Sequence, residues 1–218
     1  IWNAGGDVLS PDGRTAVGFF DGTPAVRALS FLRDLIEKDK AAPRLSQAAA
    51  LGIDFFGNAR SAMKISGHWE LVGLASAPKV KLDEVGVVQL PTELKDSVTV
   101  AYEAGLSLGR HCRDVEAAWD FIRYYTSGEF QMEYQTTGIA ICARKAVAEA
   151  RADTPVKQKF VAIAGEARQP WGAVVPGYDQ VERIGQDALD RILTHGIDPQ
   201  EALSAAAREI DIALAEAR

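Results

Sequence analysis

Apolar residues recur at helical spacing over most of the chain, which predicts a helix-rich fold. In residues 23–38, for example, Leu29, Leu32 and Ile36 fall on one face, and Pro24 stands in the first turn. Other segments show the same spacing or open at a capping residue. The predicted helices are residues 23–38, a stretch that ends at 55–57, a segment from Gly67 onward, residues 113–126, 127–138 and 178–195, one that opens at Pro155 and one that opens at Asp198-Pro199.

Strand patterns are few and short. Residues 62–67 alternate between apolar and polar positions, residues 85–91 are rich in valine and stop at a proline, and residues 105–109 form a third candidate. Because helices separate these segments, they predict a small α/β sheet with parallel pairing. Three short strands cannot satisfy their own edges. We therefore expect either a very small sheet covered by helices or further strands outside this chain.

The composition is that of a water-soluble globular protein. Apolar residues make up 47% and charged residues 25%, which argues against disorder and against a membrane-spanning chain. The net charge of −6 and the scattered basic residues make nucleic acid a poor partner. The chain begins at Ile1 without an initiator methionine or a signal region, so we expect that an upstream segment has been removed.

Motifs for catalysis and metal binding are weak. GLSLG at residues 105–109 has the letters of a nucleophile elbow but lacks Asp and His partners in the required order. The three histidines are isolated from one another, so we expect no metal and no cofactor. Cys112 and Cys142 show no paired-cysteine motif, and we expect free thiols rather than a disulfide. Glu70 and Glu103 keep a glycoside hydrolase open as an alternative, because two carboxylates can flank a sugar bond.

Aromatic residues at the edges of predicted elements indicate a binding surface. Trp69 follows a small Ser-Gly pair, Tyr102 precedes a strand pattern, and Trp171 and Tyr178 lie in a Pro/Gly-rich loop before a helix. Flat rings exposed in this way suit stacking on sugar faces, although each ring can equally anchor a loop. Trp119, in contrast, lies on the apolar face of a predicted helix, and we expect it in the core.

Five segments occur in an order that is more specific than any one of them. They are GGD near the start with DLI at residues 34–36, FFGNARSAMKISGHWE followed by VGVVQLP, EAAWDFIRYYTSGEFQMEY, TGIAICARKAV and DPQEALSAAAREI. In this order they resemble the family 1 extracellular solute-binding proteins of ABC importers, the maltose-binding-protein-like group. The resemblance covers essentially the whole chain. It departs from the family where Cys142-Ala143 replaces a usual proline.

The resemblance implies the type II periplasmic-binding-protein fold, in which two lobes close on a ligand. Residues 1–90 and 138–218 would form the carboxy-terminal lobe. Residues 91–137 would supply a strand and a helix pair to the amino-terminal lobe, most of which would be absent. The apolar face around Val115 and Ile122 would then need a covering surface. We expect a longer polypeptide or a second chain to provide the missing lobe.

The resemblance also implies a substrate-binding component rather than an enzyme. Such a protein captures a carbohydrate or related solute and delivers it to a membrane permease, in the periplasm or outside the cell, as a soluble or lipid-anchored protein. A non-catalytic interaction module is a further alternative. In the family, the Trp at the position of Trp69 stacks on sugar, while Arg144 and Arg168 leave an anionic solute open. The candidate ligand-binding residues are Trp69, Tyr178, Tyr102, Glu103, Trp171, Gly67 and Arg144.

Overall fold

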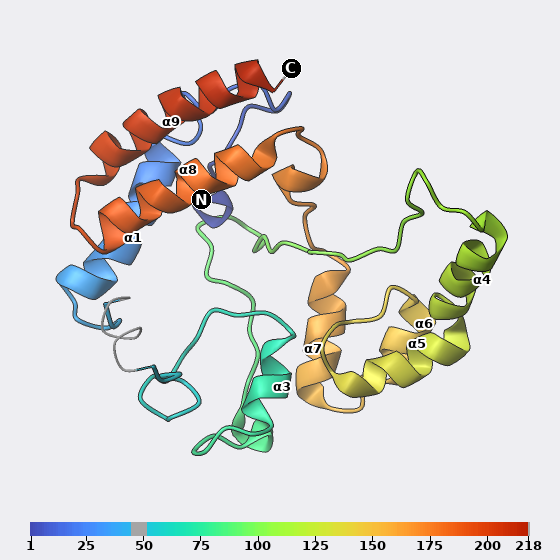
Figure 1. The fold of residues 1–218 in the computed structure, drawn as a ribbon. Coiled ribbons are helices and arrows are strands. Elements are labelled where there is room, and N and C mark those ends of the chain that lie inside the picture. The colour runs from blue at the N-terminus through green and yellow to red at the C-terminus, as the bar shows by residue number, and fades with distance from the viewer. Residues whose placement is uncertain (45–51, 218) are drawn as a thin grey trace. The chain divides into compact units, whose positions relative to one another are not determined.

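The computed structural model describes residues 1–44 and 52–217 (Figure 1). Its contacts divide the chain into two compact units, each assembled from separate segments. Unit 1 comprises Ile1–Ile53, Leu90–Val98 and Arg168–Arg218, and unit 2 comprises Asp54–Gln89 and Thr99–Ala167. Among the described helices, none combines the length and the apolar composition of a membrane span.

Three long helices form the core of unit 1. They are α1 (Thr23–Glu37), α8 (Tyr178–Leu193) and α9 (Pro199–Glu216), which pack against one another (Figure 1). Short 3-10 turns, η1 (Trp2–Ala4) and η4 (Trp171–Ala173), precede α1 and α8. The predicted apolar stripe of the last helix is confirmed. Its residues Leu203, Ala206, Ile210 and Leu214 are all buried in the shared core.

Local chemistry explains where α9 starts and how it is held. The carboxylate of Asp198 accepts hydrogen bonds from the backbone N–H groups of Gln200 and Glu201, at 3.0 and 3.2 Å, so it caps the first turn as predicted. Farther along, Asp211 accepts a 2.6 Å hydrogen bond from the hydroxyl of Thr15. This bond fastens the loop before α1 to the final helix.

Unit 2 consists of shorter helices separated by irregular segments. The side chains of Asp114, Ser127 and Thr154 cap three of these helices by accepting hydrogen bonds from backbone N–H groups of the first turn. Gly138 ends the helix pair with a φ of 71°, a conformation that glycine adopts easily. The elements are α3 (Glu70–Leu74), η2 (Leu82–Glu84), α4 (Val115–Tyr125), α5 (Gly128–Tyr134), η3 (Gln135–Thr137), α6 (Lys145–Ala150) and α7 (Pro155–Ala164).

The prediction of a small sheet is wrong for the described residues, which contain no strand. Residues 62–67, 85–91 and 105–109 lack regular structure instead. Several of their apolar side chains are exposed: Met63 and Val88 are each 84% accessible. A strand forms only against a partner that accepts and donates its backbone hydrogen bonds, and these segments have none in the part of the chain that is described.

A second difference concerns α4. The expected core residue Trp119 is 52% exposed, so that expectation is wrong in this structure. The rings that connect α4 with α5 are Tyr124 and Tyr125, which lie 5.3 and 4.7 Å from the ring of Phe130. Trp119 makes no such ring contact among the described residues. The outer face of α4 is therefore an exposed apolar surface.

Two other expectations have different outcomes. The helix predicted to end at residues 55–57 falls partly on residues 45–51, which lie outside the described residues, while residues 55–59 form turns. Cys112 and Cys142 are both free thiols, as expected. The assignment of residues 91–137 to a second lobe concerns a larger assembly than this chain. The two units do not test it, so it stays a prediction.

Candidate functional site

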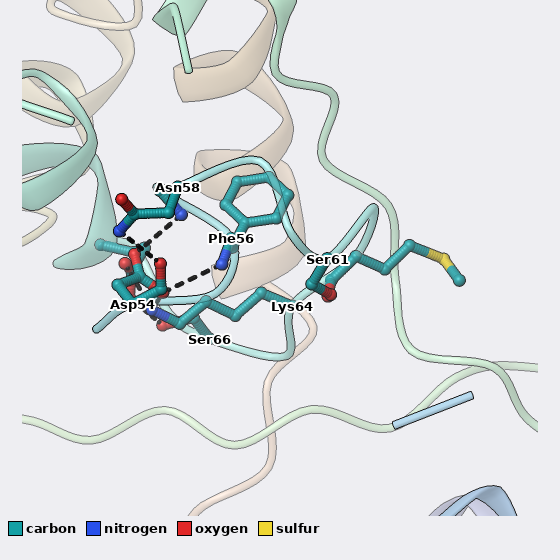
Figure 2. Close-up of polar contacts among 9 residues, drawn as sticks. Asp54, Phe56, Asn58, Ser61, Lys64 and Ser66 are labelled. Atoms are coloured by element: carbon teal, nitrogen blue, oxygen red, sulfur yellow. Dashed lines mark hydrogen bonds and ion pairs between the residues drawn. The ribbon is translucent and has the colours of Figure 1, made fainter. Parts of the chain in front are cut away.

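A network of polar groups holds the loop that leads to Trp69 in unit 2 (Figure 2). The Lys64 ammonium lies 2.8 Å from Oε1 of Glu70 and 3.2 Å from Oδ1 of Asp54. The hydroxyl of Ser66 donates a 2.8 Å hydrogen bond to the other carboxylate oxygen of Glu70. Lys64 therefore connects Asp54, at the start of the loop, with Glu70, the first residue of α3. These two ion pairs hold the loop closed.

Asp54 also shapes the turn at the start of this loop. Its carboxylate accepts hydrogen bonds from the backbone N–H groups of Phe56 and Gly57. Burial raises the pKa of Asp54, but the hydrogen bonds from Lys64 and the two backbone groups outweigh it and lower the pKa overall. Burial likewise lowers the pKa of Lys64, and the bonds to Glu70 and Asp54 outweigh that and raise it. Asp54 and Lys64 therefore stay ionised at neutral pH.

Trp69 projects from this closed loop. It stands at the amino-terminal cap of α3, and its side chain is 57% exposed. A Cβ built on Gly67 would lie 2.3 Å from two carbons of the indole ring, so the ring lies directly over the glycine backbone. Only glycine at residue 67 leaves room for this placement. The result is a large aromatic surface, open to solvent and fixed at its base.

His68 anchors the same loop on its inner side. It is buried, and its imidazole meets the ring of Phe160 from α7 edge-on at 5.3 Å between centroids. Burial and the nearby charge of Lys157 lower the pKa of His68, against the opposing effect of the backbone groups of Ile139 and Gly138. The imidazole is thus neutral at pH 7. His68 is buried in unit 2, whereas its neighbour Trp69 is exposed to solvent.

A second cluster of aromatic and charged side chains lies in unit 1. The Oδ1 atom of Asp7 accepts 2.7 Å hydrogen bonds from the indole N–H groups of Trp2 and Trp171 and from the backbone N–H of Val8. The other oxygen, Oδ2, accepts a 2.7 Å hydrogen bond from Nη2 of Arg168. We call Trp2, Asp7, Arg168 and Trp171 the Asp7 cluster.

Cation–π contacts complete the Asp7 cluster. The guanidinium carbon of Arg168 lies 4.2 Å from the ring centroid of Trp2 and 5.7 Å from that of Trp171. Burial raises the pKa of Asp7, but the hydrogen bonds from Trp171, Trp2, Arg168 and Val8 outweigh it and lower the pKa overall. Asp7 is therefore a carboxylate at neutral pH, paired with a permanent cation.

The remaining predicted residues lie in different surroundings. Tyr178 begins α8 and packs against the core of unit 1, where a Cβ on Gly172 would lie 3.1 Å from its ring. Tyr102 is 69% exposed, in a segment without regular structure. Arg144 precedes α6 and donates a hydrogen bond to the carbonyl of Thr126.

The structure thus brings some predicted residues together and leaves others apart. Gly67 and Trp69 touch each other in unit 2, while Trp171 and Tyr178 flank the junction of η4 and α8 in unit 1. Tyr102, Arg144 and the exposed Glu103 make no hydrogen bond or ring contact with Trp69 in the part of the chain that the structure describes. Nothing in this arrangement tests their assignment to a ligand site.

Three members of the Asp7 cluster escaped the sequence-based list of candidates. Trp2 and Asp7 flank the double glycine near the start, and Arg168 precedes Trp171 by three positions. The GGD motif was the available signal, because a carboxylate beside two glycines and a tryptophan is an unusual combination. Two partners of Asp7, Arg168 and Trp171, lie more than 160 positions away, so spacing alone does not reveal them.

The class of protein follows from the family that the sequence matches. Residues 3–180 match the family of bacterial extracellular solute-binding proteins. The chain belongs to this family. Proteins of this solute-binding family serve ABC transporters and are not catalytic. A comparison with curated protein sequences gave no significant match.

Solved structures of solute-binding proteins share the fold. The GacH receptor of Streptomyces glaucescens, solved unliganded and with acarbose, aligns with a TM-score of 0.80 at 19% identity, over 100% of this chain and 56% of that one. Maltose-bound MalE3 of Thermotoga maritima aligns with a TM-score of 0.73 at 23% identity, over 97% and 55% of the two chains. The chain therefore spans about half the length of these relatives and has part of the periplasmic-binding-protein fold.

Proposed function

We propose that this chain is the carboxy-terminal, ligand-contacting part of a carbohydrate-binding protein that delivers its ligand to an ABC importer in the periplasm or outside the cell. The observation that carries the proposal is Trp69, which presents an exposed ring on a loop closed by Lys64, Asp54 and Glu70. An indole face matches the apolar face of a sugar ring. Solved relatives that bind maltose, maltotriose and acarbose support a saccharide as the ligand.

Calorimetry with neutral mono-, di- and trisaccharides tests this function. The polypeptide to use is the longer one that contains this chain, because its relatives are almost twice as long. Wild type is expected to bind at least one saccharide without cleaving it, and Trp69→Ala should weaken binding at least tenfold, about 1.4 kcal/mol. Phe31→Ala is the matched control, since Phe31 is an aromatic residue of α1 that is 60% exposed and belongs to the other unit. Saccharide cleavage would favour a glycoside hydrolase instead.

We also propose that the exposed face of α4 packs against the remainder of the full-length protein, the lobe that this chain largely lacks. Val115 and Trp119 are one helical turn apart on the same side of α4, and they are 55% and 52% exposed. Contiguous apolar surface of this kind usually marks an interface. A fluorescent dye for apolar surfaces should bind this chain strongly and the longer polypeptide weakly. Equal binding to both would mean that the face stays uncovered, which would favour an interaction module.

A further inference from the structure

The Asp7 cluster holds its four side chains in a fixed arrangement. One carboxylate oxygen of Asp7 accepts N–H groups from both indoles, and the second oxygen accepts one from Arg168. The guanidinium in turn lies over the ring of Trp2. Neither indole can rotate without breaking a hydrogen bond to Asp7, so the cluster is organised in advance of any ligand.

The cluster still offers unused hydrogen-bonding groups. The Arg168 side chain is 40% exposed, and its Nε and Nη1 groups donate no hydrogen bond among the described residues. The Asp7 side chain is 23% exposed, and its Oδ2 atom accepts one bond where a carboxylate oxygen can accept two. Donors and an acceptor therefore lie side by side next to an aromatic ring. Two neighbouring hydroxyl groups of a sugar ring match this pattern, because one can accept from Arg168 while the other donates to Asp7.

Charge decides which class of solute fits. The Asp7 carboxylate and the Arg168 guanidinium are 2.7 Å apart and cancel each other's charge. A phosphate or carboxylate on a ligand would gain from the guanidinium but would also meet the Asp7 carboxylate. A neutral hydroxylated ring avoids this repulsion.

On the basis of the function proposed above, we propose that the Asp7 cluster is a subsite for a neutral polyhydroxylated ring. Within it, Asp7 sets the preference for neutral over anionic solutes by pairing with Arg168. Asp7 also holds the indoles of Trp2 and Trp171 beside the ligand.

The decisive experiment compares neutral saccharides with their phosphorylated counterparts, for example maltose with maltose 1-phosphate, by calorimetry on the longer polypeptide. Wild type should prefer the neutral member of each pair. Asp7→Asn leaves Arg168 without its carboxylate partner, so neutral binding should fall about tenfold, and the ratio of neutral to anionic affinity should fall at least tenfold. Glu93→Gln is the matched control, because Glu93 pairs with Arg27 on the surface of the same unit; both affinities should stay unchanged.

A readout without substitution covers the case in which Asp7→Asn does not fold. The indole N–H signals of Trp2 and Trp171 in nuclear magnetic resonance spectra of wild type should shift when the neutral saccharide is added. Two results would make the cluster a structural anchor only and leave the proposed function standing. One is that the neutral saccharide binds without shifting the indole signals; the other is that the ratio of neutral to anionic affinity is unchanged in Asp7→Asn. If wild type binds no saccharide of either kind, the proposed function and this inference both fail.

Discussion

The indole of Trp69 lies so close to Gly67 that any side chain at residue 67 would occupy the space of the ring. Gly67→Ala should therefore push the indole aside. Because the displaced atoms belong to an exposed side chain and not to the backbone, the fold should remain intact. The proposed stacking surface would be lost, and saccharide affinity should fall about tenfold in calorimetric titrations. Gly73→Ala is the matched control, since a Cβ there meets nothing within 4 Å. Equal saccharide affinities of the two variants would show that binding does not depend on the position of the Trp69 ring.

His68 should make the stability of unit 2 depend on pH. Its pKa is lowered by burial in the folded state, so below the ordinary value of 6.5 the unfolded chain takes up a proton before the folded one does. Well above pH 6.5 the imidazole is neutral in both states and this difference in proton uptake vanishes. The free energy of unfolding should therefore fall as the pH drops from about 7 to 5. Urea denaturation at several pH values measures this fall, which His68→Phe should reduce. An imidazole titration midpoint at or above 6.5 would contradict the prediction.

Two isoleucines of α9 allow a test of the core of unit 1. Ile210 is fully buried, whereas Ile212 is 62% exposed on the same helix. Ile210→Ala should lower the free energy of unfolding by about 2–5 kcal/mol, because it removes buried apolar area and leaves a cavity. Ile212→Ala should change it by less than about 0.5 kcal/mol. Chemical denaturation of both variants checks the difference. Similar losses would mean that the outer face of α9 is also packed.

Local signals in the sequence predicted the helices well. The cap at Asp198 and the stop at Gly138 involve residues only a few positions apart, and the apolar stripe of α9 needs only one helix to be recognised. Strands differ, because a segment such as residues 85–91 has the right composition but becomes a strand only beside a partner. Trp119 shows the same limit, since its apolar face predicts burial without saying what covers it.

In the candidate site, the sequence predicted which side chain is exposed but not the contacts that hold it. Trp69 follows a small loop and was expected to be accessible, which the structure confirms. The network under it was not foreseen, because Lys64 reaches two carboxylates that are ten positions before it and six after it. Residues six or ten positions apart are not neighbours along a helix or a strand, so no regular period predicts these contacts.

The segmented construction of unit 1 affects the order in which the protein acquires its structure. The core of this unit needs α8 and α9, yet α1 and the loop before it precede all of unit 2 in the chain. A ribosome or export channel that releases the chain from its amino-terminal end completes unit 2 while Leu29 and Phe20 still lack their packing partners. These apolar residues stay exposed until the final helices emerge, and in that interval chaperones and proteases have access to them.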